Sequence, residues 1–148
     1  RCGLPGRRPE PSPVTGARRM GRSLKPFRHP WLWAGLWVLA IAAVVVGSLV
    51  PGRDLPAVPV SDKLEHFAAY AVLAAGAVQL FARRASWAFV CLLLVLMGIG
   101  LEVLQAKMAL GRMLDRNDAL ANTIGVLLGL ATSLTPWRDA LLRLDPRD

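Results

Sequence analysis

Four stretches of the chain are apolar for long enough to form membrane-crossing helices, and polar or Pro-rich segments separate them. The stretches cover residues 31–50, 64–82, 85–105 and about 118–134. A run of about 20 apolar residues makes a helix about 30 Å long, which matches the thickness of the hydrocarbon core of a bilayer. The pattern therefore predicts an all-α membrane protein with a bundle of four transmembrane helices.

The connections predict how these helices follow one another. Only Arg83 and Arg84 separate the second and third stretches, so these two helices should form an antiparallel hairpin. Pro136 ends the fourth stretch, which closes a membrane domain of residues 31–135. The tail that follows, residues 136–148, is too short and too charged to span. The sequence leaves open whether it lies at the membrane interface or is loose.

The segment before the first stretch has almost nothing to bury. Residues 1–28 are rich in Pro, Gly and Arg, so we expect a disordered basic tail. Met20 is a natural translation start, and the residues before it are given no functional weight. A signal peptide is the alternative interpretation of residues 31–50. That run is too long for the apolar part of a signal peptide and no small-residue cleavage site follows it, so we interpret it as an anchor.

Composition supports the bilayer as the solvent. The chain is 54% hydrophobic and its mean hydropathy is +0.42. A net charge of +8 would suggest nucleic acid in a soluble protein, but no basic patch is interleaved with aromatic residues. We interpret the basic residues as orientation signals and contacts to lipid headgroups, with membrane lipids as partners and no nucleic acid. Cys2 and Cys91 suggest neither a disulfide nor a metal site.

Basic residues also predict the orientation. Thirteen of the 18 lie in the amino-terminal flank, the hairpin and the carboxyl tail, against five on the other side. Without the residues before Met20 the bias is eight against five. Because basic residues concentrate on the cytoplasmic side, both termini should be cytoplasmic. All five tryptophans fall toward that side, and six of the ten acidic residues fall toward the outer side.

Polar residues gather at the outer ends of three helices. Ionisable groups are costly near lipid. Asp62, His66 and Tyr70 would lie within about 80° of one another on one helix, so their stripe should face the bundle or a water-filled notch. The residues expected to form a polar pocket there are Asp62, Lys63, His66, Tyr70, Glu102, Gln105, Arg112, Asp118 and Asn122.

A pair of glycines shares the polar side of the fourth stretch. Gly125 and Gly129 lie four residues apart and within about 60° of Asp118 and Asn122. Small residues at this spacing let helix backbones approach closely in a membrane, so we expect Gly125 and Gly129 to pack against a neighbouring helix. The same glycines could serve self-association, which the sequence leaves open.

Each polar residue has a structural and a functional interpretation. His66 either fixes packing by hydrogen bonding to Asp62 or Glu102, or accepts a proton or contacts a ligand. Glu102 either pairs with a basic neighbour or is held protonated. Arg112 suits a phosphate or carboxylate on a ligand, or a plain lipid headgroup.

Three other residues have mainly structural interpretations. Gln105 and Asn122 are expected to form interhelical hydrogen bonds, and Tyr70 is expected to anchor its phenol near a polar neighbour.

The sequence predicts no metal site and no cofactor. His66 is the only histidine of the polar set, and four convergent ligands cannot be named. No nucleophile has an evident base beside it, and Gly-rich nucleotide loops are absent from the sequence. If the protein is an enzyme, which the sequence leaves open, the candidate catalytic residues are His66 and Glu102.

Across residues 61–130 the polar set resembles the VanZ-like family of small bacterial integral membrane proteins. The resemblance is carried by Asp62-Lys63-x-x-His66-Phe67-x-x-Tyr70, then Glu102-x-x-Gln105, then Arg112, Asp118, Asn122, Gly125 and Gly129. It implies a multi-pass protein of the bacterial cytoplasmic (inner) membrane. The member that gives the family its name is linked to resistance to the glycopeptide teicoplanin.

We therefore expect the outer-face pocket to bind an amphipathic envelope component or a lipoglycopeptide, and so to contribute to glycopeptide resistance. An alternative is an outer-leaflet enzyme acting on lipid-linked or phospholipid headgroups. A second alternative is a structural or assembly protein without a ligand.

Overall fold

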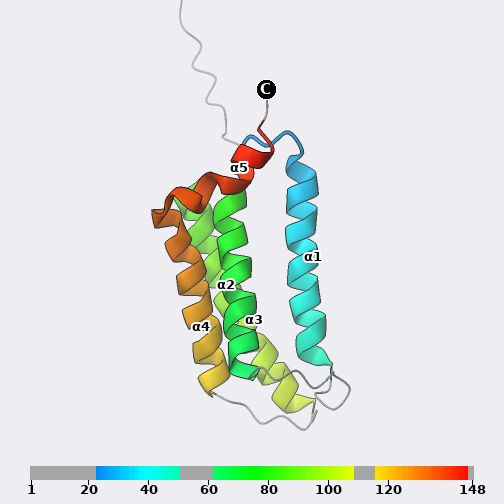
Figure 1. Ribbon diagram of the computed structural model, residues 1–148. Coiled ribbons are helices and arrows are strands. Elements are labelled where there is room, and N and C mark those ends of the chain that lie inside the picture. Colours follow the sequence, from blue (N-terminus) through cyan, green and yellow to red (C-terminus); the bar gives the residue numbers. More distant parts are fainter. Residues whose placement is uncertain (1–22, 51–61, 109–115, 147–148) are drawn as a thin grey trace, which may run out of the picture.

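The computed structural model describes residues 23–50, 62–108 and 116–146, and these residues are mostly helical, with no strand among them. Figure 1 shows the long helices α1 to α4 side by side, with short helical turns across one end. The prediction of an all-α fold is confirmed for this part of the chain. The elements are α1 (Pro30–Leu49), α2 (Asp62–Leu80), α3 (Arg84–Lys107), α4 (Arg116–Ala131), the 3-10 turns η2 (Thr132–Leu134) and η3 (Pro136–Asp139), and α5 (Ala140–Leu144).

Two of the described helices, α1 and α3, are long and apolar enough to cross a membrane. The segments Arg116–Leu134 and Pro136–Leu144, which meet at 81°, make a third candidate if they are counted as one broken span. Helix α2 is not among them, because its first turn carries Asp62, Lys63, Glu65 and His66. Four spans and cytoplasmic termini therefore stay predictions.

Helix α2 lies at the centre of the bundle and packs most extensively against α4. Ala74, Ala77 and Val78 are fully buried on α2, and Tyr70 and Leu73 are almost so. Two glycines of α4 allow the two helices to lie this close. A Cβ atom added to Gly125 would overlap the carbonyl oxygen of Phe67 in α2, and one added to Gly129 would overlap that of Ala71. The two glycines thus let α4 lie directly on the α2 backbone.

Helix α1 is peripheral and has no buried residue. Trp37 attaches it to the rest of the bundle. The indole N–H donates to the Leu73 carbonyl at 2.9 Å, and the ring contacts Phe81 edge-on at 6.0 Å between centroids. The ring lies on Gly76, where an added Cβ would come within 2.7 Å of it. An apolar helix with no buried residue and one wholly exposed face suits a lipid environment.

Residues 23–28, which we expected to belong to the disordered tail, are folded against the end of α2. The Lys25 N–H donates to the Leu80 carbonyl at 2.8 Å, and the Lys25 ammonium donates to the Val78 carbonyl at 2.8 Å. The last carbonyls of a helix have no partner within the helix and carry partial negative charge. A buried lysine satisfies them here. Residues 1–22 of the predicted tail lie outside the described residues.

The carboxyl-terminal segment, whose placement the sequence left open, lies at the same end of the bundle (Figure 1). The Gln79 side chain accepts from the Leu141 N–H at 3.1 Å. Asp145 accepts hydrogen bonds from the His29 backbone at 2.9 Å and from the Trp33 indole at 2.8 Å. These bonds hold α5 against α2 and the start of α1.

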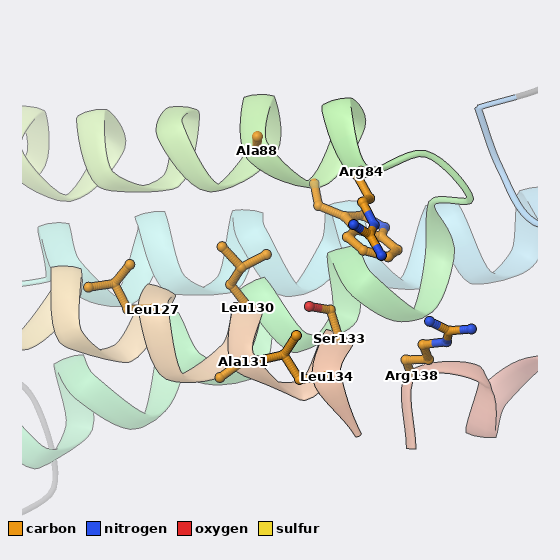
Figure 2. Close-up of a pocket in the computed structure, with 9 residues that line it drawn as sticks. Arg84, Ala88, Leu127, Leu130, Ala131, Ser133, Leu134 and Arg138 are labelled. Carbon is orange, nitrogen blue, oxygen red and sulfur yellow. The ribbon is translucent and has the colours of Figure 1, made fainter. Parts of the chain in front are cut away.

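A groove of about 420 Å³ opens at this end, between the start of α3 and the end of α4. Figure 2 shows the guanidinium groups of Arg84 and Arg138 at its rim and aliphatic side chains along its wall. The lining residues are Arg84, Trp87, Ala88, Leu127, Leu130, Ala131, Ser133, Leu134 and Arg138.

The α2–α4 contact predicts a strong difference between two glycines. Gly125→Ala should destabilise the protein by about 1–3 kcal/mol, because the methyl group would force the backbones apart. Gly100→Ala is the matched control: nothing lies within 4 Å of its added Cβ, and alanine is the better helix former. Thermal unfolding in detergent or nanodiscs measures both. Equal melting temperatures for the two variants would contradict the packing described.

The closure by Lys25 predicts a pH dependence. Its ammonium lies 2.9 Å from an Asp139 carboxylate oxygen, and this hydrogen bond is the main reason that the Asp139 pKa lies below its usual value of 3.8. A carboxyl whose pKa is lowered by folding stabilises the protein above the unfolded pKa, and this stabilisation is lost as the pH falls through the folded pKa.

Asp139→Asn should therefore lower stability at pH 7 by about 1 kcal/mol or less, since the carboxylate is partly exposed. The difference from wild type should shrink as the pH falls below 3.8 and through the lowered pKa of the folded state. Melting curves at several pH values test this, with Glu65→Gln as a control on an exposed acid. A difference that persists undiminished at pH 2 would exclude the ion pair as its source.

Candidate functional site

Three helices bring an imidazole and two carboxylates together at the end of the bundle opposite α5. Single nitrogen or oxygen atoms of His66, Glu102 and Asp118 all lie within 4.8 Å of one another. Helices α2 and α4 begin at this end and α3 ends there, as Figure 1 shows. At 1.5 Å per residue, each of the three positions is within about 8 Å of its helix end. We call these three residues the polar cluster.

The carboxylates of the polar cluster are buried, whereas its imidazole is partly exposed. Glu102 and Asp118 keep only 6% and 8% of their surface accessible. Two carboxylates so close together and so poorly solvated cannot both stay charged unless a proton or a cation compensates them. The cluster therefore favours positively charged or hydrogen-bond-donating groups in its vicinity. The cluster is accessible from the side of His66, which is partly exposed.

A second set of residues lies one helical turn deeper. Tyr70 follows His66 by four residues on α2, Asn122 follows Asp118 by four on α4, and Gly98 precedes Glu102 by four on α3. A Cβ atom on Gly98 would come within 3.2 Å of the Tyr70 hydroxyl and 3.0 Å of the Asn122 amide nitrogen. These two side chains thus meet over a residue that has none.

The deeper layer carries unusual buried oxygens. Tyr70 is 1% exposed and Asn122 is 2% exposed. Within the described part of the chain, neither the Tyr70 hydroxyl nor the Asn122 carbonyl oxygen has a hydrogen-bond partner. Because an unsatisfied buried polar atom costs about 1–3 kcal/mol, such atoms in a native protein need an explanation.

Other residues of the expected pocket are placed differently. Gln105 is buried, but its amide donates to the Ser48 carbonyl near the end of α1, so it ties α3 to α1. Lys63 is exposed at the start of α2. Asp62 begins α2, but its side chain lies outside the described residues, as does Arg112.

Sequence reasoning missed Gly98. Its position four residues before Glu102 on the same helical face was the available signal. No metal site was predicted because His66 is the only histidine of the polar set and four ligands could not be named, although one imidazole with two carboxylates is a chemically sufficient set of three ligands.

The chain matches no protein-family model, no curated protein and no solved structure. The resemblance to the VanZ-like family therefore stays a prediction.

Proposed function

We propose that this chain is a VanZ-like, multi-pass protein of the bacterial inner membrane whose polar cluster binds the polar part of an amphipathic envelope component. The observation that carries the proposal is the convergence of His66, Glu102 and Asp118 from three helices, near one end of an otherwise apolar bundle. Ionisable side chains at membrane depth are rare and usually mark a ligand or ion site.

The surroundings of the cluster suit a molecule with one polar and one apolar part. Carboxylate and amide oxygens accept hydrogen bonds from the hydroxyl, amide or ammonium groups of a headgroup. Near the same end of the bundle, Leu64, Leu120 and Ile124 are exposed on α2 and α4 and would lie against acyl chains. A lipid-linked envelope precursor has this design, and so does a lipoglycopeptide such as teicoplanin.

A groove with two arginines at the other end suits the same membrane environment. The groove between α3 and α4 presents Arg84 and Arg138 above an aliphatic wall (Figure 2). Guanidinium groups bind phosphate oxygens well, and basic pockets between helices on the cytoplasmic side accept anionic headgroups. With this end in the cytoplasm, as the basic residues predict, the polar cluster would face the outer leaflet.

A second candidate function is an enzyme acting on headgroups at the outer leaflet. The closeness of the His66 imidazole to two carboxylates favours it, because a carboxylate can orient and polarise an imidazole that acts as a general base. Lipid extracts distinguish the two candidates. Turnover changes the headgroup profile between cells with wild-type protein and cells with Glu102→Gln, whereas binding alone leaves the profiles alike.

The binding function predicts loss of protection when the cluster is altered. In a host where the wild-type protein raises the inhibitory concentration of teicoplanin, His66→Ala and Glu102→Gln should return it to the vector level. Glu65→Gln, an exposed acid one residue from His66, should keep the wild-type value. Membrane levels of all variants are matched by immunoblot. Full protection by both cluster variants would exclude the cluster from the mechanism.

The deeper layer predicts a graded effect. Gly98→Ala should push Asn122 and Tyr70 outward by a few tenths of an ångström, since its added Cβ would lie 3.0–3.3 Å from them. We expect a severalfold smaller increase in the inhibitory concentration than wild type gives. Gly100→Ala, on the open face of α3, should match wild type. Equal behaviour of the two variants would mean that the deeper layer does not contribute.

A further inference from the structure

We propose that His66, Glu102 and Asp118 bind one divalent first-row metal ion, with Zn²⁺ or Mn²⁺ as the best fit. The site is that of the proposed function, but the inference holds whatever headgroup the site accepts. It rests on three observations: the geometry of the cluster, its charge, and the buried oxygens beneath it.

The geometry is close to that of a three-ligand site. Metal bonds of about 2.0–2.2 Å separate neighbouring ligand atoms by roughly 3–4 Å. The three candidate atoms here lie within 4.8 Å of one another. Small side-chain rotations would bring the ligand atoms to this separation. Each of the three side chains can rotate independently because each lies on a different helix. Three protein ligands also leave a coordination position for water or a headgroup oxygen, as in catalytic zinc sites.

The charge of the cluster matches a divalent ion. Glu102 and Asp118 together supply two negative charges when ionised, and both are more than nine-tenths buried. A divalent cation bound between them neutralises the pair without a proton and with little net charge in a poorly solvated site. Neutral His66 contributes a nitrogen ligand at the partly exposed side, where an ion would enter.

The deeper layer is the independent observation. The hydroxyl of Tyr70 and the carbonyl oxygen of Asn122 are buried, have no hydrogen-bond partner among the described residues, and lie one turn below the cluster on the same helical faces. Metal ligands and metal-bound water are commonly held by such outer groups. A metal-bound water would give the Asn122 oxygen a donor.

The ligand types narrow the choice of ion. One imidazole and two carboxylates lack the thiolates that favour Cu(I) or iron–sulfur clusters. Calcium takes six to eight oxygen ligands, and magnesium is rarely bound by imidazole. Zn²⁺ and Mn²⁺ accept mixed nitrogen and oxygen ligands, and both can be bound by only three protein ligands.

The test is metal content of the full chain. The protein, carrying an affinity tag without histidine, is purified in detergent from cells grown with added Zn²⁺ and Mn²⁺, and metals are counted by mass spectrometry. We expect about one ion per wild-type chain. Glu102→Gln and Asp118→Asn, which keep side-chain shape, should fall to a tenth of that value or less. Glu65→Gln should match wild type.

A second measurement covers variants that fold poorly. Wild-type protein stripped with a chelator should gain thermal stability when Zn²⁺ or Mn²⁺ is returned, and Glu102→Gln should not. Metal-free wild type with no thermal shift would overturn the inference. Wild-type metal levels in both carboxylate variants would overturn it as well.

These results are separate from the headgroup function. Loss of teicoplanin protection in His66→Ala, together with a wild type that binds no metal, refutes the metal and leaves the proposed function standing. If the wild type binds metal but the cluster variants protect fully against teicoplanin, the metal site stands and the proposed function is refuted.

Discussion

The close contact between α4 and α2 is the constraint on which the rest of the structure depends. Gly125 and Gly129 allow the α4 backbone to lie against the carbonyls of Phe67 and Ala71 with no side chain between them. Helices in lipid associate through such packing rather than through a hydrophobic driving force. Once the two backbones are this close, the polar residues that share the glycine face of α4 necessarily face α2 and α3. The polar cluster therefore forms because Gly125 and Gly129 lie on the same face of α4 as Asp118 and bring that face against α2.

The two ends of the bundle handle charge differently. At the end with α5, Lys25 is buried against the last carbonyls of α2 and pairs with Asp139, so a positive charge satisfies a helix terminus. At the other end, Glu102 and Asp118 are buried together beside His66, which concentrates negative charge. The second arrangement places two buried carboxylates beside a partly exposed imidazole, a combination that favours a cation or a hydrogen-bond donor.

The sequence predicted much of this because the governing signals are periodic. Apolar runs predicted all four long helices to within a few residues, and the shared face of Asp118, Asn122, Gly125 and Gly129 is where α4 meets α2. The fate of individual long side chains was not predictable, since it depends on tertiary contacts. Lys25 was expected in a disordered tail because that segment is rich in Pro, Gly and Arg, and nothing local indicates that its ammonium donates to a carbonyl more than 50 residues away.

Two further outcomes lay outside the reach of periodicity. Gln105 forms an interhelical hydrogen bond, as expected, but its spacing to Glu102 did not indicate that the acceptor is the Ser48 carbonyl of α1. Gly98 carries no side chain to mark it, and its role emerges only when Tyr70 and Asn122 meet over it. The central claim is that polar stripes from different helices share one site. A double-mutant cycle of unfolding free energy for His66→Ala and Asp118→Asn, on α2 and α4, tests it most directly: the account predicts a coupling of about 0.5–3 kcal/mol, and additivity within about 0.3 kcal/mol would contradict it.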